Sequence, residues 1–374
     1  MRSALVIFMG LHGIVHLFGF LKAFGLSEFN AIVQPNSKYF GSLWLLAFIL
    51  FSATLVLMLL NNRFWWLSGL LAVLLSQSLI INHWTDAKFG TLANIIILLA
   101  VLIGYSGYRF TNKIQEERTV ILQNSQSVEE QILTQKGIAD LPPIIQKWLT
   151  SSGIIGKRPI SNIYLTQELQ LKMKPGQEDW YKGTAEQYFT VDPPAFHWDI
   201  NTKMNPFLSV VGRDKFENGK GEMMIKLLSF LPVANAANDP KVNQATLQRF
   251  LAEIIWFPSA AMSPYIQWET LSEVSAKATM DYKGTIGSGE FHFDTNGNFK
   301  KFVAMRYQDA KASEPTEWTV IATKIEKRNG VDIPVECEAA WTLDSCKWTW
   351  LKVKIKDITY NLEKIPSSGS DHYK

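Results

Sequence analysis

Four apolar runs in the first 108 residues constrain this chain more than any other feature of its sequence. They cover Ser3 to Phe24, Tyr39 to Leu60, Phe64 to Trp84 and Phe89 to Tyr108, and each is nearly free of charge. Each run is long enough to cross the roughly 30 Å hydrocarbon core of a bilayer. A backbone in lipid must satisfy its hydrogen bonds within the segment, so we expect four transmembrane helices that form an anchor.

The charged residues divide the chain into two unlike parts. The residues before Phe110 carry a net charge of +4, whereas the remainder has 31 basic and 32 acidic residues. This balance provides no basic field for nucleic acid, so we expect no nucleic-acid partner. An even number of spans places both chain ends on the same side of the membrane. Arg2, Arg63 and Arg109 fall on that side. The positive-inside rule then favours a cytoplasmic soluble domain.

Ionisable residues inside the anchor are the first candidate site. His12 and His16 lie one helical turn apart, and placing such groups in hydrocarbon costs a few kcal/mol. His83 and Asp86, at the end of the third run, or Asn94 could complete a cluster with them that binds a metal or a quinone. The alternative is that neutral histidines hydrogen-bond across the bundle.

A polar segment separates the anchor from a β-rich domain. We divide the chain into an anchor over 1–110, a juxtamembrane helical linker over 111–139 and a soluble domain over 140–374. Pro142 or Pro143 begins a short helix, since proline is tolerated in the first turn, and Gly153 ends it.

Beyond that helix the apolar period changes from helical to two. Alternating residues from Ile163 to Met173 have one apolar and one polar side, as a half-buried strand requires. Similar alternation appears around Trp198, Phe291, Val320 and Val353, and the pairs Asn296-Gly297 and Asn329-Gly330 favour hairpin turns. These features predict a long antiparallel meander with one wet face.

The segment from Gly221 to Pro264 interrupts this pattern. We interpret it as an apolar loop followed by an amphipathic helix, with Asp239 as N-cap, Pro240 at the first helical position and Trp256-Phe257-Pro258 at the end. A curved sheet with one wet face must cover the other face, and this insertion is the natural cover. The fold class that we predict is therefore α+β, a four-helix transmembrane bundle followed by an antiparallel half-barrel with a helical lid.

A half-barrel with a methionine-rich lid suits a flexible apolar ligand. The predicted ligand-binding residues are Met223, Met224, Leu228, Phe230, Phe250, Trp256, Phe257 and Arg306. Arg306 would need a partner such as Glu290 if it pointed inward, and the alternative is an ion pair at the rim of the sheet. The alternative is that the helix and the sheet close a dry core.

Other polar and sulfur groups in the domain carry weaker signals. His197, Asp199 and Arg213-Asp214 fall on polar strand positions, which are usually solvated surface. Cys337 and Cys346 could flank a hairpin near Leu343, but a disulfide is not predicted from that placement.

Three runs resemble a known group of proteins: Gly10-Leu11-His12-Gly13-Ile14-Val15-His16, Asp86-Ala87-Lys88-Phe89-Gly90-Thr91 and Ile255-Trp256-Phe257-Pro258. They are similar to an uncharacterised family of bacterial membrane proteins, most without an assigned activity. The resemblance implies a bacterial inner-membrane location and brings no catalytic residues. By architecture alone, the predicted sheet with its lid also looks like the half-barrels of LolA/LolB-type lipoprotein carriers.

No nucleotide-binding, zinc-protease or nucleophile-elbow motif occurs, so no enzyme class or cofactor is indicated. Three functions remain open. The chain could be a membrane-anchored module for a lipid or another apolar ligand. It could be an intramembrane metal- or quinone-dependent redox protein centred on His12, His16 and His83. It could also be a structural or regulatory membrane protein that binds a protein partner.

Overall fold

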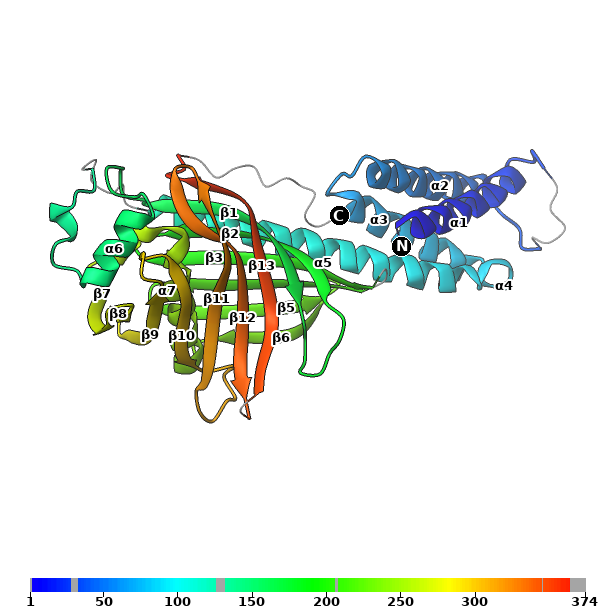
Figure 1. Cartoon of the computed structure of the whole chain (residues 1–374). Coiled ribbons are helices and arrows are strands. Elements are labelled where there is room, and N and C mark those ends of the chain that lie inside the picture. Colours follow the sequence, from blue (N-terminus) through cyan, green and yellow to red (C-terminus); the bar gives the residue numbers. More distant parts are fainter. Residues whose placement is uncertain (1, 28–32, 126–131, 206–207, 345, 364–374) are drawn as a thin grey trace. The chain divides into compact units, whose positions relative to one another are not determined.

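The structure is a computed structural model that describes residues 2–27, 33–125, 132–205, 208–344 and 346–363. The chain forms two compact units (Figure 1). Unit 1 contains Met1–Asn112 and Leu228–Phe230, and unit 2 contains Lys113–Leu227 and Leu231–Lys374. Each unit is described by itself.

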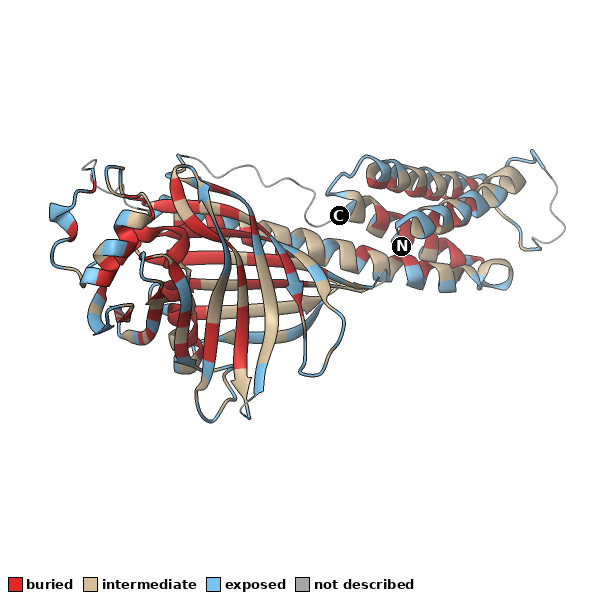
Figure 2. Cartoon of the chain, viewed as in Figure 1, coloured by how far each residue is buried: buried red, intermediate tan, exposed pale blue. Residues whose placement is uncertain are grey.

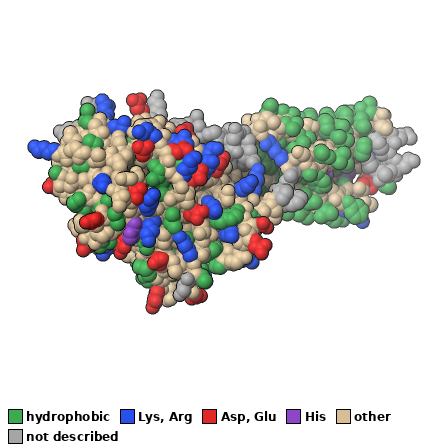
Figure 3. Space-filling model, viewed as in Figure 1, with side chains coloured by type: hydrophobic (Ala, Val, Ile, Leu, Met, Phe, Trp, Pro, Cys, Tyr) green, Lys and Arg blue, Asp and Glu red, His purple; other side chains and the backbone are tan. Residues whose placement is uncertain are grey.

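Unit 1 is built from apolar helices. The helices of this region are α1 (Arg2–Ala23), α2 (Lys38–Leu59), α3 (Trp65–Asn82), α4 (Trp84–Ala87) and α5 (Gly90–Gln123), of which α5 continues into unit 2. All except α4 are long and apolar enough to cross a membrane. The side chains on the visible surface of these helices are largely hydrophobic (Figure 3). That surface is what a helix in contact with lipid requires.

Small residues let the helices of unit 1 approach closely. A Cβ atom added at Gly19 would lie 2.6 Å from the Trp44 ring, and one at Gly13 would lie 3.0 Å from Phe51. Glycine at such positions allows close helix packing where no hydrophobic driving force acts between helices in lipid.

Unit 2 contains one large antiparallel sheet. Its strands are β1 (Asn162–Leu171), β2 (Tyr181–Thr190), β3 (Ala195–Asn205), β4 (Leu208–Glu217), β5 (Lys220–Leu227), β6 (Leu231–Ala237), β7 (Ile266–Ser272), β8 (Ser275–Tyr282), β9 (Thr285–Phe293), β10 (Phe299–Arg306), β11 (Thr316–Arg328), β12 (Val331–Leu343) and β13 (Cys346–Tyr360). The order is β6-β5-β4-β3-β2-β1-β13-β12-β11-β10-β9-β8-β7. Two meanders are thus joined where β1 pairs with β13, and β6 and β7 remain unjoined edges (Figure 1). The predicted α+β class is confirmed.

Helical elements cover one face of this sheet. They are η1 (Lys136–Ile138), α6 (Pro143–Ser151), α7 (Pro240–Glu253), η2 (Ile254–Trp256) and η3 (Pro258–Met262). Helix α7 contacts β4, β5 and β6 from one meander and β8, β9 and β10 from the other, so the sheet curves around it. We call the face that α7 covers the inner face. The opposite face, against which residues 113–123 of α5 pack, is the outer face.

The main core lies between the inner face and these helices. Alternate residues of the strands are buried there, which produces the banded pattern of Figure 2. Phe189, Phe196, Phe216 and Phe250 pack against one another with ring centroids 6.0–6.5 Å apart along the chain of contacts. Burial of this kind contributes about 1.5–3 kcal/mol for each large apolar side chain.

The predicted loop over the first part of the 221–264 insertion is wrong. Residues 220–227 and 231–237 are strands β5 and β6. Strand β5 does not show the alternation of apolar and polar residues, because Met223 and Met224 are adjacent and both apolar. Met223 faces inward, and Met224 lies beside Arg213 on the outer face. The helix that follows is confirmed: Asp239 accepts from the backbone N–H groups of Lys241 and Val242, and Pro240 begins α7.

Other local predictions are confirmed as well. Helix α6 begins at Pro143, and Gly153 follows it with a φ of +72°. Gly297 and Gly330, at the predicted hairpin turns, have φ values of +85° and +80°, which glycine adopts without steric penalty.

Candidate functional site

A chain of polar side chains crosses the inner face of the sheet beside α7. Trp198 on β3 donates its indole N–H to Gln167 on β1 at 2.8 Å. Gln167 donates its amide to Gln187 on β2 at 3.1 Å, and Gln187 donates to Glu253 at 2.8 Å. In an otherwise apolar interior, each of these groups would be costly to bury without its partner.

Helix α7 closes this chain with charged groups. Arg249 donates to Glu253, one turn further along the helix, at 2.9 Å and to Asp214 on β4 at 2.6 Å. The guanidinium also lies over the Trp198 ring, 4.5 Å from its centroid. We call Gln167, Gln187, Trp198, Asp214, Arg249 and Glu253 the polar row.

A row of tryptophans lies on the same face, on the other meander. Trp318, Trp341 and Trp348 are in register on β11, β12 and β13, so their side chains share one face. Arg306 of β10 lies 4.6 Å from the Trp318 ring centroid and 5.7 Å from that of Trp341. Its Nε donates to the backbone carbonyl of Ala245 in α7 at 2.9 Å.

Burial perturbs the titratable groups of this face. It lowers the pKa of Arg306 to about 10, and the positive charge of Arg249 acts in the same direction. It raises the pKa of the Glu253 carboxyl, although Arg249 opposes the shift. It also raises the pKa of the Cys337 thiol, which lies on β12 of the same face, to about 12. Such shifts in a partly apolar setting mark a candidate site.

Part of the inner face beyond the polar row is only half-buried. Leu169, Leu171, Ala185 and Ile200 form a small apolar cluster there. Half-buried side chains pack against that cluster, namely Trp198, Trp350, Leu351 and Val353. Helix α7 and the following 3₁₀ turns pack in the main core, so these four side chains keep more exposure than the core residues of the same strands.

The predicted ligand-binding residues are distributed over several environments. Phe250, Trp256 and Phe257 are fully buried in the main core, where they fill the interior. Met223 is half-buried on the inner face and Met224 on the outer face.

The remaining three predicted residues lie apart from that core. Leu228 and Phe230 fall in the turn between β5 and β6, and Phe230 is exposed. Arg306 points inward, and Glu290 is not its partner, because Glu290 lies on the outer face and pairs with His292.

The outer face carries a buried ion network that the sequence analysis missed. Arg118 of α5 is 1% exposed and forms ion pairs with Glu186 at 2.7 Å and with Asp199. Its guanidinium also lies over the Tyr188 ring at 4.8 Å. The prediction that Asp199 is solvated surface is therefore wrong, because residues 113–123 of α5 cover these strand positions.

A second group of charges extends this network along α5. His197, which is fully buried, lies 3.1 Å from Glu117 through Nε2, and burial lowers the pKa of its imidazole while Glu117 opposes that shift. Arg213 pairs with Glu117 at 3.2 Å and with Glu222 at 2.9 Å. The signal that could have revealed the network is the run Glu116-Glu117-Arg118, placed between Ile114 and Ile121 on a helix whose apolar face continues past the last predicted span.

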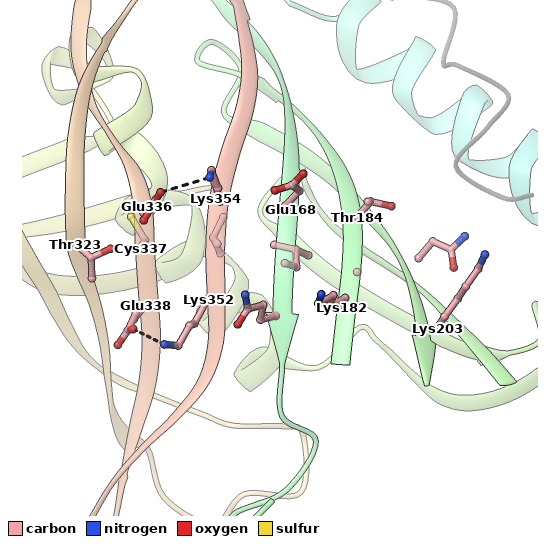
Figure 4. Close-up of a pocket in the computed structure, with 15 residues that line it drawn as sticks. Glu168, Lys182, Thr184, Lys203, Thr323, Glu336, Cys337, Glu338, Lys352 and Lys354 are labelled. Carbon is pink, nitrogen blue, oxygen red and sulfur yellow. Dashed lines mark ion pairs between the residues drawn. The ribbon is translucent and has the colours of Figure 1, made fainter. Parts of the chain in front are cut away.

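A cavity of about 1170 Å³ lies on the outer face across β1, β2, β12 and β13 (Figure 4). Its charged lining is largely paired: Lys352 with Glu338 at 3.0 Å and Lys354 with Glu336 at 3.7 Å. A lining with charges of both signs favours water over an apolar ligand. This agrees with the prediction of a wet face.

The structure brings His12 and His16 together in unit 1, but with hydroxyl and amide groups. His16 lies 2.8 Å from the Ser76 hydroxyl, and His12 lies 2.9 Å from the Asn94 side chain. Asn94 also contacts Ser76 at 3.0 Å.

The other two predicted metal ligands have different neighbours. His83 packs against the Phe40 and Trp44 rings, and Asp86 accepts from the backbone N–H of Gln34 at 2.8 Å. Within the described part of the chain, no three His, Cys, Asp or Glu side chains gather into a group that could hold a metal ion.

The fold and these faces define a class: a protein with apolar N-terminal helices and an open, curved antiparallel sheet that encloses a helix. Within that class, the chain belongs to a family of unknown function, DUF6920, whose match covers residues 139–360. The match agrees with the expected resemblance to a family without an assigned activity, over the C-terminal part of the chain.

Comparison with other proteins adds little. None of the curated proteins matches the chain. One solved structure is similar, a β-barrel-like protein of domain of unknown function DUF1849 from Brucella abortus. The similarity has 9% identity and a TM-score of 0.23, and it covers 54% of this chain and 99% of that one. At that TM-score the likeness supports no argument about function.

Proposed function

We propose that the chain is a membrane-anchored module that binds a lipid or a similar amphiphile on the half-buried patch of the inner face. The patch is defined by Trp198, Trp350, Leu351 and Val353. It borders the polar row, of which Trp198 is also a member, and the row of tryptophans, which ends at Trp348 on β13. An apolar surface with a few convergent polar groups at its edge is the usual chemistry of a small-molecule site.

One observation carries the proposal. The indole N–H groups of Trp318, Trp348 and Trp350 are buried, and none has an acceptor among the residues that the structure describes. An unmade hydrogen bond of a buried donor costs about 1–3 kcal/mol. A ligand that brings oxygen atoms to this aromatic surface would supply acceptors while its chain covers the apolar side chains.

The guanidinium of Arg306 adds a cation to the same face. Its Nε donates to the Ala245 carbonyl, and Glu290, which was considered as its partner, pairs with His292. A planar guanidinium stacked on tryptophan rings retains donors for a carboxylate or phosphate oxygen. The head of a fatty acid or phospholipid provides such oxygens.

A photoactivatable fatty acid tests the proposal on the full chain in maltoside micelles. We expect adducts, mapped by peptide mass spectrometry, on β13 around Leu351 and on β3 around Trp198, and we expect excess unlabelled fatty acid to suppress them. Adducts on the apolar helices do not count, because any amphiphile partitions there. Absence of a suppressible adduct on both strands would reject the proposal.

A pair of matched variants sharpens the test. Leu351→Glu places a carboxylate on the half-buried patch and is expected to abolish the β13 adduct. Leu271→Glu makes the same change on edge strand β7, where the side chain is 44% exposed, and is expected to leave that adduct unchanged.

Membrane location and orientation are part of the proposal. Four helices with the length and composition of membrane spans support it. The cytoplasmic placement of the sheet follows only from the positive-inside rule. A reporter fused after Lys374 is expected to be active in the cytoplasm, and activity only in the exported form would reverse the orientation.

A further inference from the structure

The hydrogen-bond network inside unit 1 has a direction that its donors and acceptors determine. The Nδ1 atom of His16 lies 2.8 Å from the backbone carbonyl oxygen of His12, which can only accept. The Nδ1 atom therefore carries the hydrogen. Because an imidazolium is costly in hydrocarbon, the ring is neutral and Nε2 is an acceptor.

The hydroxyl of Ser76 donates to that acceptor. Its single hydrogen can reach His16 Nε2 at 2.8 Å or Asn94 Oδ1 at 3.1 Å. Asn94 Oδ1 already accepts from His12 Nε2 at 2.9 Å, whereas His16 Nε2 has no hydrogen of its own. The amide Nδ2 of Asn94 then donates to Ser76 Oγ at 3.0 Å and to Gln77 at 3.0 Å.

This arrangement contains the parts of an activated nucleophile. A hydroxyl hydrogen-bonded to an imidazole, which is oriented through its other nitrogen, is the geometry by which serine is made reactive. A neutral amide donor beside the hydroxyl is a group that can stabilise an oxyanion. We propose that Ser76 and His16 form a nucleophile–base pair that transfers the acyl group of a lipid ester.

The depth of the pair indicates the substrate class. At 1.5 Å per residue, Asn94 lies roughly 6 Å from the start of α5, Ser76 roughly 9 Å from the end of α3 and His16 roughly 10 Å from the end of α1. These three ends belong to the same end of an antiparallel bundle. The pair therefore lies several Å inside the hydrocarbon core, below the boundary at which the acyl ester carbonyls of glycerolipids lie, so the ester must be carried on a lipid that can enter to this depth.

The chemistry balances with water as the second reactant. Ser76 Oγ bonds to the ester carbon while its proton passes to His16 Nε2, and the carbonyl electron pair moves to the oxygen. The Asn94 Nδ2–H that donated to Ser76 Oγ is released by this step and donates to the oxyanion instead. The carbon–alkoxy bond breaks, and the departing alcohol takes the proton from His16. Water then repeats the sequence on the acyl-serine, which releases a fatty acid and restores the hydroxyl.

Access to the pair requires motion of the bundle. Ser76 is fully enclosed, and the Trp44 and Phe51 rings pack against His16. The network comes nearest the surface at Gln77, which is half-buried and donates to the Thr91 hydroxyl at 3.2 Å. The ester therefore enters beside Gln77, between α3 and α5, and His12 acts as a positioning residue for the Asn94 amide.

A long-chain alkyl fluorophosphonate, with the full chain in detergent, tests the proposal. The reagent bonds to an activated serine with loss of fluoride, and intact mass and peptide mapping report the adduct. We expect one adduct, on Ser76. The labelling rate should fall about 100-fold in His16→Gln, the usual size of a lost general base.

Matched variants identify the serine. Ser76→Ala is expected to abolish labelling. Ser78→Ala removes a hydroxyl two residues away that donates to the Leu74 carbonyl, and it should label like the unmodified chain. An unlabelled wild-type chain, an adduct on another residue, or unchanged labelling in Ser76→Ala would each overturn the proposal, whether or not the histidine variant folds.

Discussion

The two faces of the sheet in unit 2 both bury polar groups, but they do so with different chemistry. Strands β2 and β3 serve both faces with alternate residues: Glu186 and Asp199 point to the outer network, and Gln187 and Trp198 belong to the polar row. The outer network pairs full charges under α5. The inner row joins amide, indole and charged groups into one chain of hydrogen bonds.

This difference indicates different roles. Removal of one partner from a buried ion pair leaves an uncompensated charge, so the outer network is strongly sensitive to change, as a structural attachment of a helix to a sheet would be. We expect the polar row to tolerate more change, because an amide has several donors and acceptors and can form a new hydrogen bond when one partner is lost. A face that binds a ligand needs this tolerance, because its hydrogen bonds change when the ligand binds.

The largest expected effect is that of Arg118→Met. The substitution keeps an unbranched apolar stem but removes the guanidinium, so Glu186 and Asp199 are left side by side without a cation. We expect unit 2 to lose about 3–5 kcal/mol of stability, measured by denaturant unfolding of the full chain. Lys113→Met, which breaks a partly exposed pair with Glu117 at 3.7 Å, is the control and should cost less than about 1 kcal/mol. Equal losses of stability in Arg118→Met and Lys113→Met would contradict the proposed role of the buried network on the outer face.

A smaller effect is expected from Glu253→Gln on the inner face. The glutamine can still accept from Gln187, and Arg249 keeps Asp214. We expect a loss of about 1–2 kcal/mol, measured in the same way. Glu290→Gln, at a 49% exposed side chain paired with His292, should change stability by no more than about 0.5 kcal/mol. A loss as large as that of Arg118→Met would remove the distinction between the faces.

The pH dependence of stability should come from the outer face. Burial lowers the pKa of His197 below 6.5, so the unfolded chain binds a proton that the folded chain rejects. The contribution of neutral His197 is complete above pH 6.5 and is lost as the pH falls from 6.5 towards the folded value, with a slope of at most about 1.4 kcal/mol per pH unit. Thermal unfolding between pH 5.5 and 7.5 should show this slope in the wild type and a flatter one in His197→Gln. Parallel profiles would show that His197 does not titrate in this range.

The smallest expected effect concerns the reactivity of the two cysteine thiols. Both cysteines, which the structure describes, are free thiols; Cys337 is buried on the inner face and Cys346 is exposed. Because burial and Glu253 raise the pKa of Cys337 to about 12, iodoacetamide at pH 8 should modify Cys346 and spare Cys337. Intact mass should show one adduct in the native chain and two in denaturant. Two adducts without denaturant would mean that the inner face opens.

Much of the architecture could be predicted from local signals. Helix α7 begins at Pro240 after Asp239 because the cap and the proline act within one turn, and β1 alternates because a half-buried strand imposes that period. Strand β5 could not be predicted, since Met223 and Met224 face two different partly apolar environments.

The candidate sites were less accessible to prediction than the elements. His12 and His16 were identified from their cost in lipid, and Asn94 as a polar group that could join them. Ser76, the partner of His16, comes from a distant helix, where a serine carries no distinctive signal of its own. The same holds for Arg118, whose carboxylate partners are separated from it by about one helix and two strands of sequence.

The amino-acid sequence alone was thus enough to predict the apolar helices, the strands that alternate clearly, such as β1, and the capped helix α7, because each depends on neighbours within a few residues. Which face of β2 and β3 meets α5 and which meets α7 depended on long-range packing. That packing turned His197 and Asp199 from expected surface residues into buried ones, since burial is a property of what covers a residue and not of the residue itself.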